Sequence, residues 1–317
     1  MFWANLLHLS FNMWEEQEAK SPRGSPPRLK ALLDIRKARP YLRFDELFWQ
    51  KITGKMAQIG MNMVVIDLGD GLQYQSHPEI AVNGAWSVNK LRKELVRLQT
   101  LGLEPIPKLN FSTTHDTWLG PYSRCVSTDA YYAVCRDLID EVCNLFHRPR
   151  FFHLGMDEET ASHQSLALYA VMRQHQLWWH DFYFLVEQVE KNGVRAWVWS
   201  DYLWHQPEVF FRKMPRSVVQ SNWYYGKVFN RKIPYVKAYL DLEQHGYDQI
   251  PTGSNWSFPE NFEKTVAYCL PRISPGKLLG FLQTPWYPTL PGYKQRHYQA
   301  IKGVEIAIRK VATREGK

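Results

Sequence analysis

The chain has 317 residues, of which 45% are hydrophobic and 15% aromatic, and its formal net charge is +8. This length and hydrophobic content predict one large buried core in a single domain. The positive charge would suit a polyanion, but the lysines and arginines are scattered, with one denser stretch from Arg23 to Arg43. We therefore do not expect the chain to bind nucleic acid.

The first residues and the cysteines bear on the compartment. "MFWANLLHLSF" is apolar, but it lacks the basic region and cleavage site of a signal peptide and is too short to span a bilayer. The four cysteines show no CxxC pair and no metal-like spacing, which is typical of free thiols in a reducing compartment. We predict a soluble, cytoplasmic protein without a membrane segment or metal, or a secreted one if a leader was removed.

Eight short apolar runs have the length of buried strands, and most are followed by a polar, aromatic loop and then a helical stretch. The predicted strands cover residues 6–11, 63–68, 105–110, 151–157, 195–201, 218–223, 247–255 and 278–286. Apolar residues recur at helical spacing in 44–59, 88–98, 134–145, 185–189, 236–240, 262–270 and 298–308. Residues 12–43 read as a long loop after the first strand, with a short helix over 29–37.

Alternating strands and helices predict an α/β fold, a (β/α)8 TIM barrel that occupies residues 1–317 as a single domain. An open doubly wound sheet is the alternative. No GxGxxG or GxxxxGK motif follows a predicted strand, so no phosphate site and no cofactor are expected.

In such a barrel the active site lies at the carboxyl ends of the strands. The polar and aromatic residues that end the predicted strands are Asp67, Asp70, Asn110, His115, Asp157, Glu158, Glu159, Trp199, Asp201, Asn222, Trp223, Tyr224, Tyr225, Asn255, Trp256, Gln283, Trp286 and Tyr287. A carboxylic acid protonates a sugar leaving group, a carboxylate stabilises a cationic anomeric centre, and aromatic rings pack on pyranose faces. This set therefore favours glycoside cleavage, with a carbohydrate as the partner.

The stretch "FFHLGMDEET" (151–160) carries the strongest signal. Side chains alternate along a strand, so Asp157 and Glu158 act together only where the strand ends and the chain turns. Crowded carboxylates resist ionising together, which raises the pKa of at least one and suits a general acid. His153 is interpreted as a barrel-wall residue and Glu159 as a charge at the start of a helix.

"FFHLGMDEE" resembles the H-x-G-G-D-E signature of the family 20 glycoside hydrolases, the β-N-acetylhexosaminidases, with Met156 in place of the second glycine. "KMAQIGMNMVVIDLGDG" and "LQTLGLEPIPKLNFSTTH" are similar to the family's second and third barrel units. "WVWSD" and "GFLQTPW" stand where the family has its W-x-D motif and its last-strand tryptophan. The similarity runs from about Phe44 to Trp286.

The resemblance implies a retaining, substrate-assisted mechanism. In it, Glu158 is the general acid/base, and Asp157 orients the 2-acetamido group, whose oxygen attacks the anomeric carbon. The remaining residues matched to substrate binding are His115, Tyr224, Tyr225, Trp199, Trp223 and Trp286, joined by the strand-end residues Asp70, Asn110 and Asp201.

Some family positions differ in this chain. The first-strand arginine is missing from "LLHLSFNMWEE", and Arg39 or Arg43 are possible substitutes. Lys108 stands where a glutamate is usual and Asn110 where an aspartate is, and Tyr287 with Pro288 replace the acidic residue after the last tryptophan.

Three functions are compatible with these residues. The first is an exo-acting β-N-acetylhexosaminidase. The second is a glycosidase with another sugar preference, in which Asp70 or Asp201 serves as base or nucleophile beside Glu158. The third is a sugar-binding protein without catalytic activity.

Overall fold

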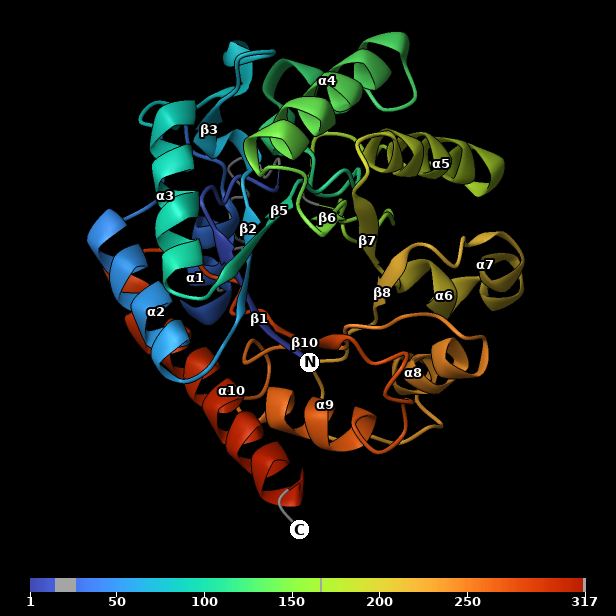
Figure 1. The fold of residues 1–317 in the computed structure, drawn as a ribbon. Helices are drawn as coiled ribbons and strands as arrows, with labels where there is room; N and C mark the ends of the chain where they lie inside the picture. Colours follow the sequence, from blue (N-terminus) through green and yellow to red (C-terminus); the bar gives the residue numbers. More distant parts are fainter. Residues whose placement is uncertain (15–26, 166, 316–317) are drawn as a thin grey trace.

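The computed structural model of the protein describes residues 1–14, 27–165 and 167–315. Parallel strands form a ring, seen along its axis in Figure 1, in the order β8-β7-β6-β5-β2-β1-β10-β9. Their bounds are β1 (Phe2–His8), β2 (Met63–Asp67), β5 (Glu104–Lys108), β6 (Phe151–His153), β7 (Arg195–Trp199), β8 (Val219–Ser221), β9 (Thr252–Gly253) and β10 (Gly280–Gln283). The predicted (β/α)8 barrel is confirmed.

The two edges of this sheet, β8 and β9, meet through isolated bridges between Gln220 and Gln249 and between Trp223 and Thr252. By contrast, β1 pairs with β2 and β2 pairs with β5 over five residues each. The ring is therefore nearly closed, and its seam between β8 and β9 has the sparser pairing.

Helices surround the ring, as Figure 1 shows. They are α1 (Pro27–Arg36), α2 (Glu46–Gln58), α3 (Val88–Thr100), α4 (Asp129–Leu145), α5 (His175–Lys191), α6 (Asp201–His205), α7 (Pro207–Lys213), α8 (Pro234–Gln244), α9 (Asn261–Cys269) and α10 (Lys294–Glu315). Short 3-10 turns η1 (Gly69–Gly71), η2 (Pro78–Ile80), η3 (Thr117–Tyr122) and η4 (Pro291–Tyr293) and a pair of short strands, β3 (Leu72–Gln73) and β4 (Trp86–Ser87), lie in the connections.

The amphipathic pattern explains why these helices form and how they pack. In α3, Ser87 caps the N-terminus by accepting a hydrogen bond from the Lys90 amide. Leu91, Leu95 and Leu98 then recur on one face and are buried against the barrel.

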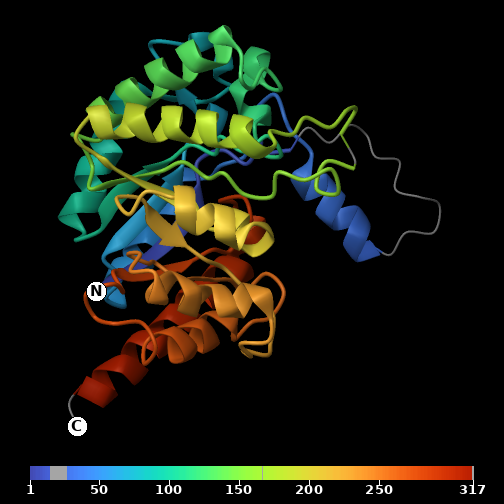
Figure 2. The ribbon, with the colours of Figure 1, turned by 90° about the vertical axis from the view of Figure 1, so that its right-hand side faces the viewer.

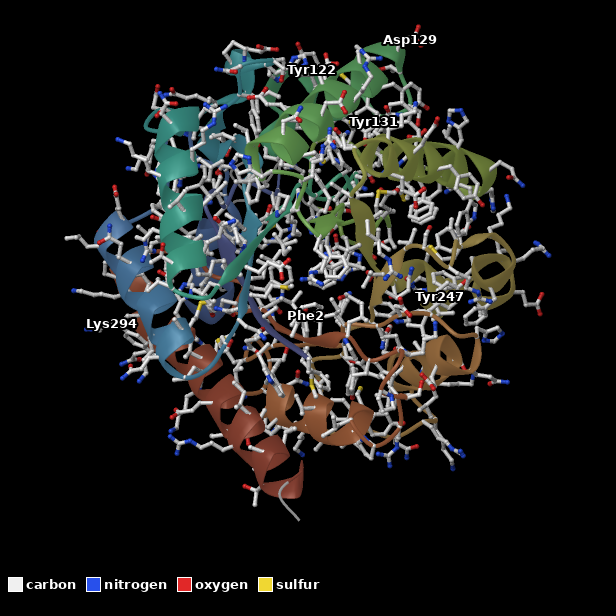
Figure 3. All side chains as sticks on the ribbon, viewed as in Figure 1. Phe2, Tyr122, Asp129, Tyr131, Tyr247 and Lys294 are labelled. Atoms are coloured by element: carbon white, nitrogen blue, oxygen red, sulfur yellow. The ribbon has the colours of Figure 1, made fainter. Side chains whose placement is uncertain are left out.

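The core has two layers, one inside the ring and one between the ring and the helices. The inner layer consists of alternate strand residues, which point inward: Ala4, Leu6, Met63, Val65, Ile106, Phe151, Trp197, Trp199, Val219, Ile250 and Leu282. Figure 3 shows side chains filling the ring, so the barrel interior is a packed core and not a channel.

The strand bounds differ from the prediction most at β1 and at β9, which covers Thr252–Gly253 where the sequence predicted 247–255, and they differ at β6 as well. β1 begins at Phe2 and ends at His8, whereas the sequence predicted 6–11. Leu9 and Phe11 are buried although they follow the strand, so apolar character does not mark its end. β6 ends at His153, four residues before the predicted end, because the chain turns at Gly155 and Met156.

Figure 2 shows α1 and the loop after β6 together at one end of the barrel, away from both termini. Since β1 runs from the N-terminus toward this end, it is the carboxyl end of the parallel strands. The predicted helix over 29–37 is α1, while residues 15–26 of the predicted long loop lie outside the described residues. Within the described ranges, no helix has an apolar stretch that would cross a bilayer.

Candidate active site

The loop after β6 has an unusual backbone that brings two acids to one place. Gly155, Met156 and Glu158 have φ values of 74°, 72° and 56°, in the left-handed region that side chains disfavour. The Gly155 amide donates to Nδ1 of His153 at 3.0 Å, which supports the turn. Strained backbone of this kind gathers at functional sites.

Asp157 is held from several sides. Its side chain accepts a hydrogen bond from Nδ2 of Asn110 at 2.9 Å, and Nδ1 of His115 lies 3.1 Å from the same oxygen. The Ser112 hydroxyl donates to the Asp157 carbonyl. With a relative exposure of 6%, Asp157 has a fixed orientation at the bottom of the site.

Glu158 is the more accessible acid, with a quarter of its side chain exposed (25%). Its two oxygens face Nε2 of His115 at 3.6 Å and Nε2 of His163 at 3.3 Å. Its backbone amide donates to Asp201 at 3.1 Å. His115 thus contacts both acids, and Glu158 faces the open space.

The surroundings drive the pKa values of the two acids apart. Burial by itself would raise the pKa of Asp157, but the charge and hydrogen bond of His115 outweigh it and hold the pKa below its usual range. Burial, together with the charge of Asp157, raises the pKa of Glu158 above its usual value. The pair therefore favours an ionised Asp157 beside a protonatable Glu158.

His115 and Asp201 respond to the same charges. Burial would lower the pKa of His115, yet the neighbouring charges of Asp157 and Glu158 raise it. Burial, again with both acids nearby, raises the pKa of Asp201 well above its usual value. Asp201 also accepts a hydrogen bond from Nε1 of Trp223 at 2.7 Å, so both of its oxygens are engaged within the protein.

Asp157 and Glu158 open onto a cavity of about 550 Å³, here called the inner cavity. Nε1 of Trp286 donates to the Tyr225 hydroxyl at 3.0 Å, and Tyr225 stacks on Trp223 with ring centroids 4.8 Å apart. The wall of the inner cavity includes the predicted residues Asn110, His115, Asp157, Glu158, Trp199, Trp223, Tyr225 and Trp286. Both size and lining suit a small polar ligand with apolar faces.

A second cavity of about 630 Å³, here called the outer cavity, lies on the other side of Glu158. The predicted residues Asp201 and Tyr224 line this cavity. Asp70 lines neither cavity, because its carboxylate binds Ser10 and Asn12 at the end of β1. Of the nine residues predicted to bind substrate, Asp70 is the one that lines neither cavity.

Trp14 and Arg36, from the segment after β1, also line the inner cavity. Arg36 lies over the Trp14 ring at 4.7 Å. The two arginines proposed from the sequence point elsewhere: Arg39 pairs with Asp34, and Arg43 donates to the carbonyl oxygens of Ile35 and Phe11. The identity of Arg36 as a wall residue could not be predicted, because several arginines surround it in a segment without clear periodicity.

Lys108 lies in the barrel interior with no exposed surface and forms an ion pair with Asp67. Nδ1 of His8 is 3.4 Å from the same carboxylate. Tyr287 contacts Trp256 and Tyr293 through its ring. These residues at divergent family positions therefore have partners within the protein.

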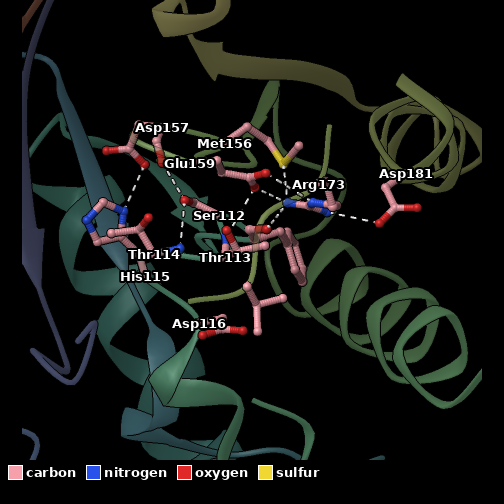
Figure 4. A network of polar contacts seen from close by, with 12 residues as sticks. Ser112, Thr113, Thr114, His115, Asp116, Met156, Asp157, Glu159, Arg173 and Asp181 are labelled. Carbon is pink, nitrogen blue, oxygen red and sulfur yellow. Dashed lines mark hydrogen bonds and ion pairs between the residues drawn. The ribbon is translucent and has the colours of Figure 1, made fainter. Parts of the chain in front are cut away.

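Glu159 does not start a helix, contrary to the interpretation from the sequence. Among the described residues between β6 and α5 there is no helix, and Glu159 forms an ion pair with the buried Arg173 (Figure 4). Arg173 also pairs with Asp181 of α5 at 3.2 Å and donates to the Phe111 carbonyl at 2.7 Å. This network anchors the chain next to Glu158, and no sequence motif marked Arg173.

His115, Asp157 and Glu158 each offer a ligand atom, and these atoms lie within 4.8 Å of one another. Within the described ranges, these three residues form the one cluster that could hold a metal ion. The same side chains already pair through the His115 imidazole. The arrangement suits proton transfer, since it combines an ionised carboxylate, an imidazole and a partly exposed acid.

Comparison with known proteins narrows the fold further. No protein-family model matches the sequence, and no curated protein sequence does. The structure is similar to β-N-acetylhexosaminidase from Bacteroides fragilis, with 15% identity, a TM-score of 0.62 and coverage of 95% of this chain and 65% of that one.

Two further solved structures give similar values. The family 20 exo-β-N-acetylglucosaminidase from Vibrio harveyi, in complex with N-acetylglucosamine, has 12% identity and a TM-score of 0.63, with 96% of this chain and 54% of that one covered. N-acetyl-β-hexosaminidase from Streptomyces plicatus has 13% identity and a TM-score of 0.63, with 96% of this chain and 62% of that one covered. The chain thus spans about half to two thirds of these proteins, and the predicted resemblance to family 20 is confirmed for the fold.

Proposed function

We propose that the protein is a glycoside hydrolase that removes terminal β-linked N-acetylhexosamine residues with retention of configuration. One observation carries the proposal: Asp157, with a lowered pKa, and Glu158, with a raised pKa, adjoin at the edge of an aromatic cavity. The similar structures belong to β-N-acetylhexosaminidases, which supports this substrate class.

The first step breaks the glycosidic bond. Glu158 donates its proton to the glycosidic oxygen, while the acetamide oxygen of the substrate attacks the anomeric carbon and the leaving group departs as an alcohol. Asp157 accepts a hydrogen bond from the acetamide N–H and stabilises the positive charge of the oxazolinium ring. Trp199, Trp223 and Trp286 of the inner cavity exclude water from this ring.

The second step releases the sugar. Glu158, now ionised, takes a proton from a water molecule, whose oxygen attacks the anomeric carbon and reopens the oxazolinium ring. Two inversions give net retention. Adjacent acids suffice because the substrate supplies the nucleophile, whereas most retaining glycosidases place two carboxylates on opposite sides of the bond.

The test compares Glu158→Gln and Asp157→Asn with the wild-type protein on aryl β-N-acetylhexosaminides. We expect Glu158→Gln to abolish hydrolysis of substrates with poor leaving groups while binding persists. Asp157→Asn should lower kcat on acetamido sugars by roughly two orders of magnitude or more. A thiazoline that mimics the cyclic intermediate should bind the wild-type protein tightly. Full activity in either variant would contradict the mechanism, and sugar binding without turnover would indicate a non-catalytic sugar-binding protein.

A further inference from the structure

Glu159, the third acid in the row 157–159, has no role in the mechanism above. Its carboxylate accepts two hydrogen bonds from Arg173, one of them from Nε at 3.2 Å, and a third from the Thr113 amide at 3.1 Å. Only 6% of the Glu159 side chain is exposed, against 25% for Glu158. The carboxylate of Glu159 is therefore bound to the protein itself, directly beside the acid that faces the open space.

The turn that carries the acids is held on both sides of Glu158. On the N-terminal side, the Asp157 carboxylate accepts a hydrogen bond from Nδ2 of Asn110 at 2.9 Å. On the C-terminal side, Glu159 pairs with Arg173 (Figure 4). Glu158 lies between these two anchors with a φ of 56°, a left-handed backbone that a side chain disfavours. Release of the second anchor would let this backbone relax, and the Glu158 carboxyl would then move.

Arg173 is a rigid base for the second anchor. Only 3% of this residue is exposed, and its guanidinium also donates to the Phe111 carbonyl at 2.7 Å and pairs with Asp181 of α5 at 3.2 Å. A planar guanidinium that forms paired hydrogen bonds with a carboxylate fixes its orientation as well as its distance. Because two separate segments hold Arg173, the position of Glu159 is fixed, and so is the start of the peptide link back to Glu158.

We propose that Glu159 is a positioning residue for the general acid: its ion pair with Arg173 holds Glu158 where its proton reaches the glycosidic oxygen. The inference rests on the proposed function, in which Glu158 protonates the leaving group. Asp157 has an anchor of its own in Asn110. Loss of the Glu159 anchor therefore impairs proton donation, while the acetamide still binds to Asp157.

The experiment compares Glu159→Gln with the wild-type protein on two aryl β-N-acetylglucosaminides. Glutamine keeps the shape of the side chain but has one acceptor oxygen in place of two and no charge, so the paired hydrogen bonds with Arg173 are lost. We expect kcat/KM, which reports the bond-breaking step, to fall about tenfold or more for the phenyl glycoside, whose leaving group needs a proton. It should fall much less for the dinitrophenyl glycoside, which departs as a phenolate. The Kd of the thiazoline should stay the same.

Asp181→Asn is the matched control, because it removes the charge of the other carboxylate that pairs with Arg173, on α5 and outside the turn. Its kcat/KM should change to the same extent for both glycosides. Arg173→Lys is the second variant, to be used if Glu159→Gln does not fold. It keeps the charge but loses the paired geometry, and it should give a leaving-group-dependent loss of the same kind.

Three results would overturn the positioning role while the proposed function stands. These are wild-type kcat/KM in Glu159→Gln, an equal loss for both glycosides, and a leaving-group-dependent loss of the same size in Asp181→Asn. A uniform loss together with weaker thiazoline binding would indicate general damage to the fold instead of a misplaced acid. If the wild-type protein hydrolyses neither glycoside, the proposed function fails first and the positioning role fails with it.

Discussion

His115 sets the protonation of both acids, because its ring nitrogens lie 3.1 Å from Asp157 and 3.6 Å from Glu158. His115→Gln keeps a donor but removes the charge, so the pKa of each acid should rise. Activity needs Asp157 ionised and Glu158 protonated. Both the acidic and the alkaline limb of the kcat/KM profile should therefore move to higher pH.

His163→Gln is the matched control for this prediction. His163 lies 3.3 Å from the other oxygen of Glu158 and lowers the pKa of that acid, whereas it is not among the groups that shift Asp157. The alkaline limb alone should move in this variant. If His115→Gln leaves both limbs in place, the imidazole does not set these pKa values.

Asp70 gives a pH-dependent stability that is separate from the site. Burial raises its pKa to about 6, despite hydrogen bonds from Ser10 and Asn12. Between about pH 4, near the ordinary pKa of an aspartate, and about pH 6, the folded state binds more protons than the unfolded state. Stability therefore falls as pH rises through this window. The shift corresponds to about 3 kcal/mol. In Asp70→Asn, the free energy of unfolding, measured with urea, should depend less on pH between pH 4 and 7. An unchanged pH dependence would show that another group causes it.

At the scale of elements, the loop after β6 depends on Gly155. A Cβ atom there would lie 1.9 Å from Oδ1 and 2.9 Å from Cα of Asn110, the residue that binds Asp157. Gly155→Ala should therefore destabilise the protein by about 3 kcal/mol or more, as strain and overpacking combine. It should also impair turnover, since Asn110 must move.

Gly193 provides the control, because its φ of 72° matches the 74° of Gly155 while nothing lies within 4 Å of an added Cβ. Gly193→Ala should cost only about 1–2 kcal/mol. Thermal and urea unfolding of the two variants separates backbone strain from crowding. A similar loss of unfolding free energy in both variants would show that the contact of the added Cβ with Asn110 is unimportant.

The same loop shows how far the sequence predicts the site. The order of strands and helices followed from apolar periodicity, and the acids at 157 and 158 followed from their place after a buried strand. Periodicity carries no information on side-chain pairing between distant segments. The Arg173 to Glu159 pair joins residues 14 positions apart across an irregular loop, and Arg36 reaches the cavity from α1, so neither could be predicted.

At the scale of the molecule, aromatic residues of the inner cavity lie close to the seam of the barrel. Trp223 and Tyr225 follow β8, and Trp223 itself bridges to Thr252 of β9 across the seam. Trp286 follows β10, the neighbour of β9. The proposed site therefore adjoins a sparsely paired part of the ring, while the five-residue pairs of β1, β2 and β5 lie away from it.

This asymmetry predicts unequal hydrogen exchange around the ring. The amides of Ile250 and Thr252 bond across the seam to Gln220 and Asn222, where the described residues form isolated bridges, whereas β2 has a five-residue ladder on each side. Peptides covering 248–253 should exchange faster than those covering 63–67, because local opening needs fewer bonds to break. A thiazoline bound in the inner cavity, whose wall includes Trp223, should slow exchange at the seam while leaving β2 unchanged. Mass spectrometry with and without ligand measures both effects, and equal protection of the two segments in the free protein would show that the seam is as stable as the rest of the barrel.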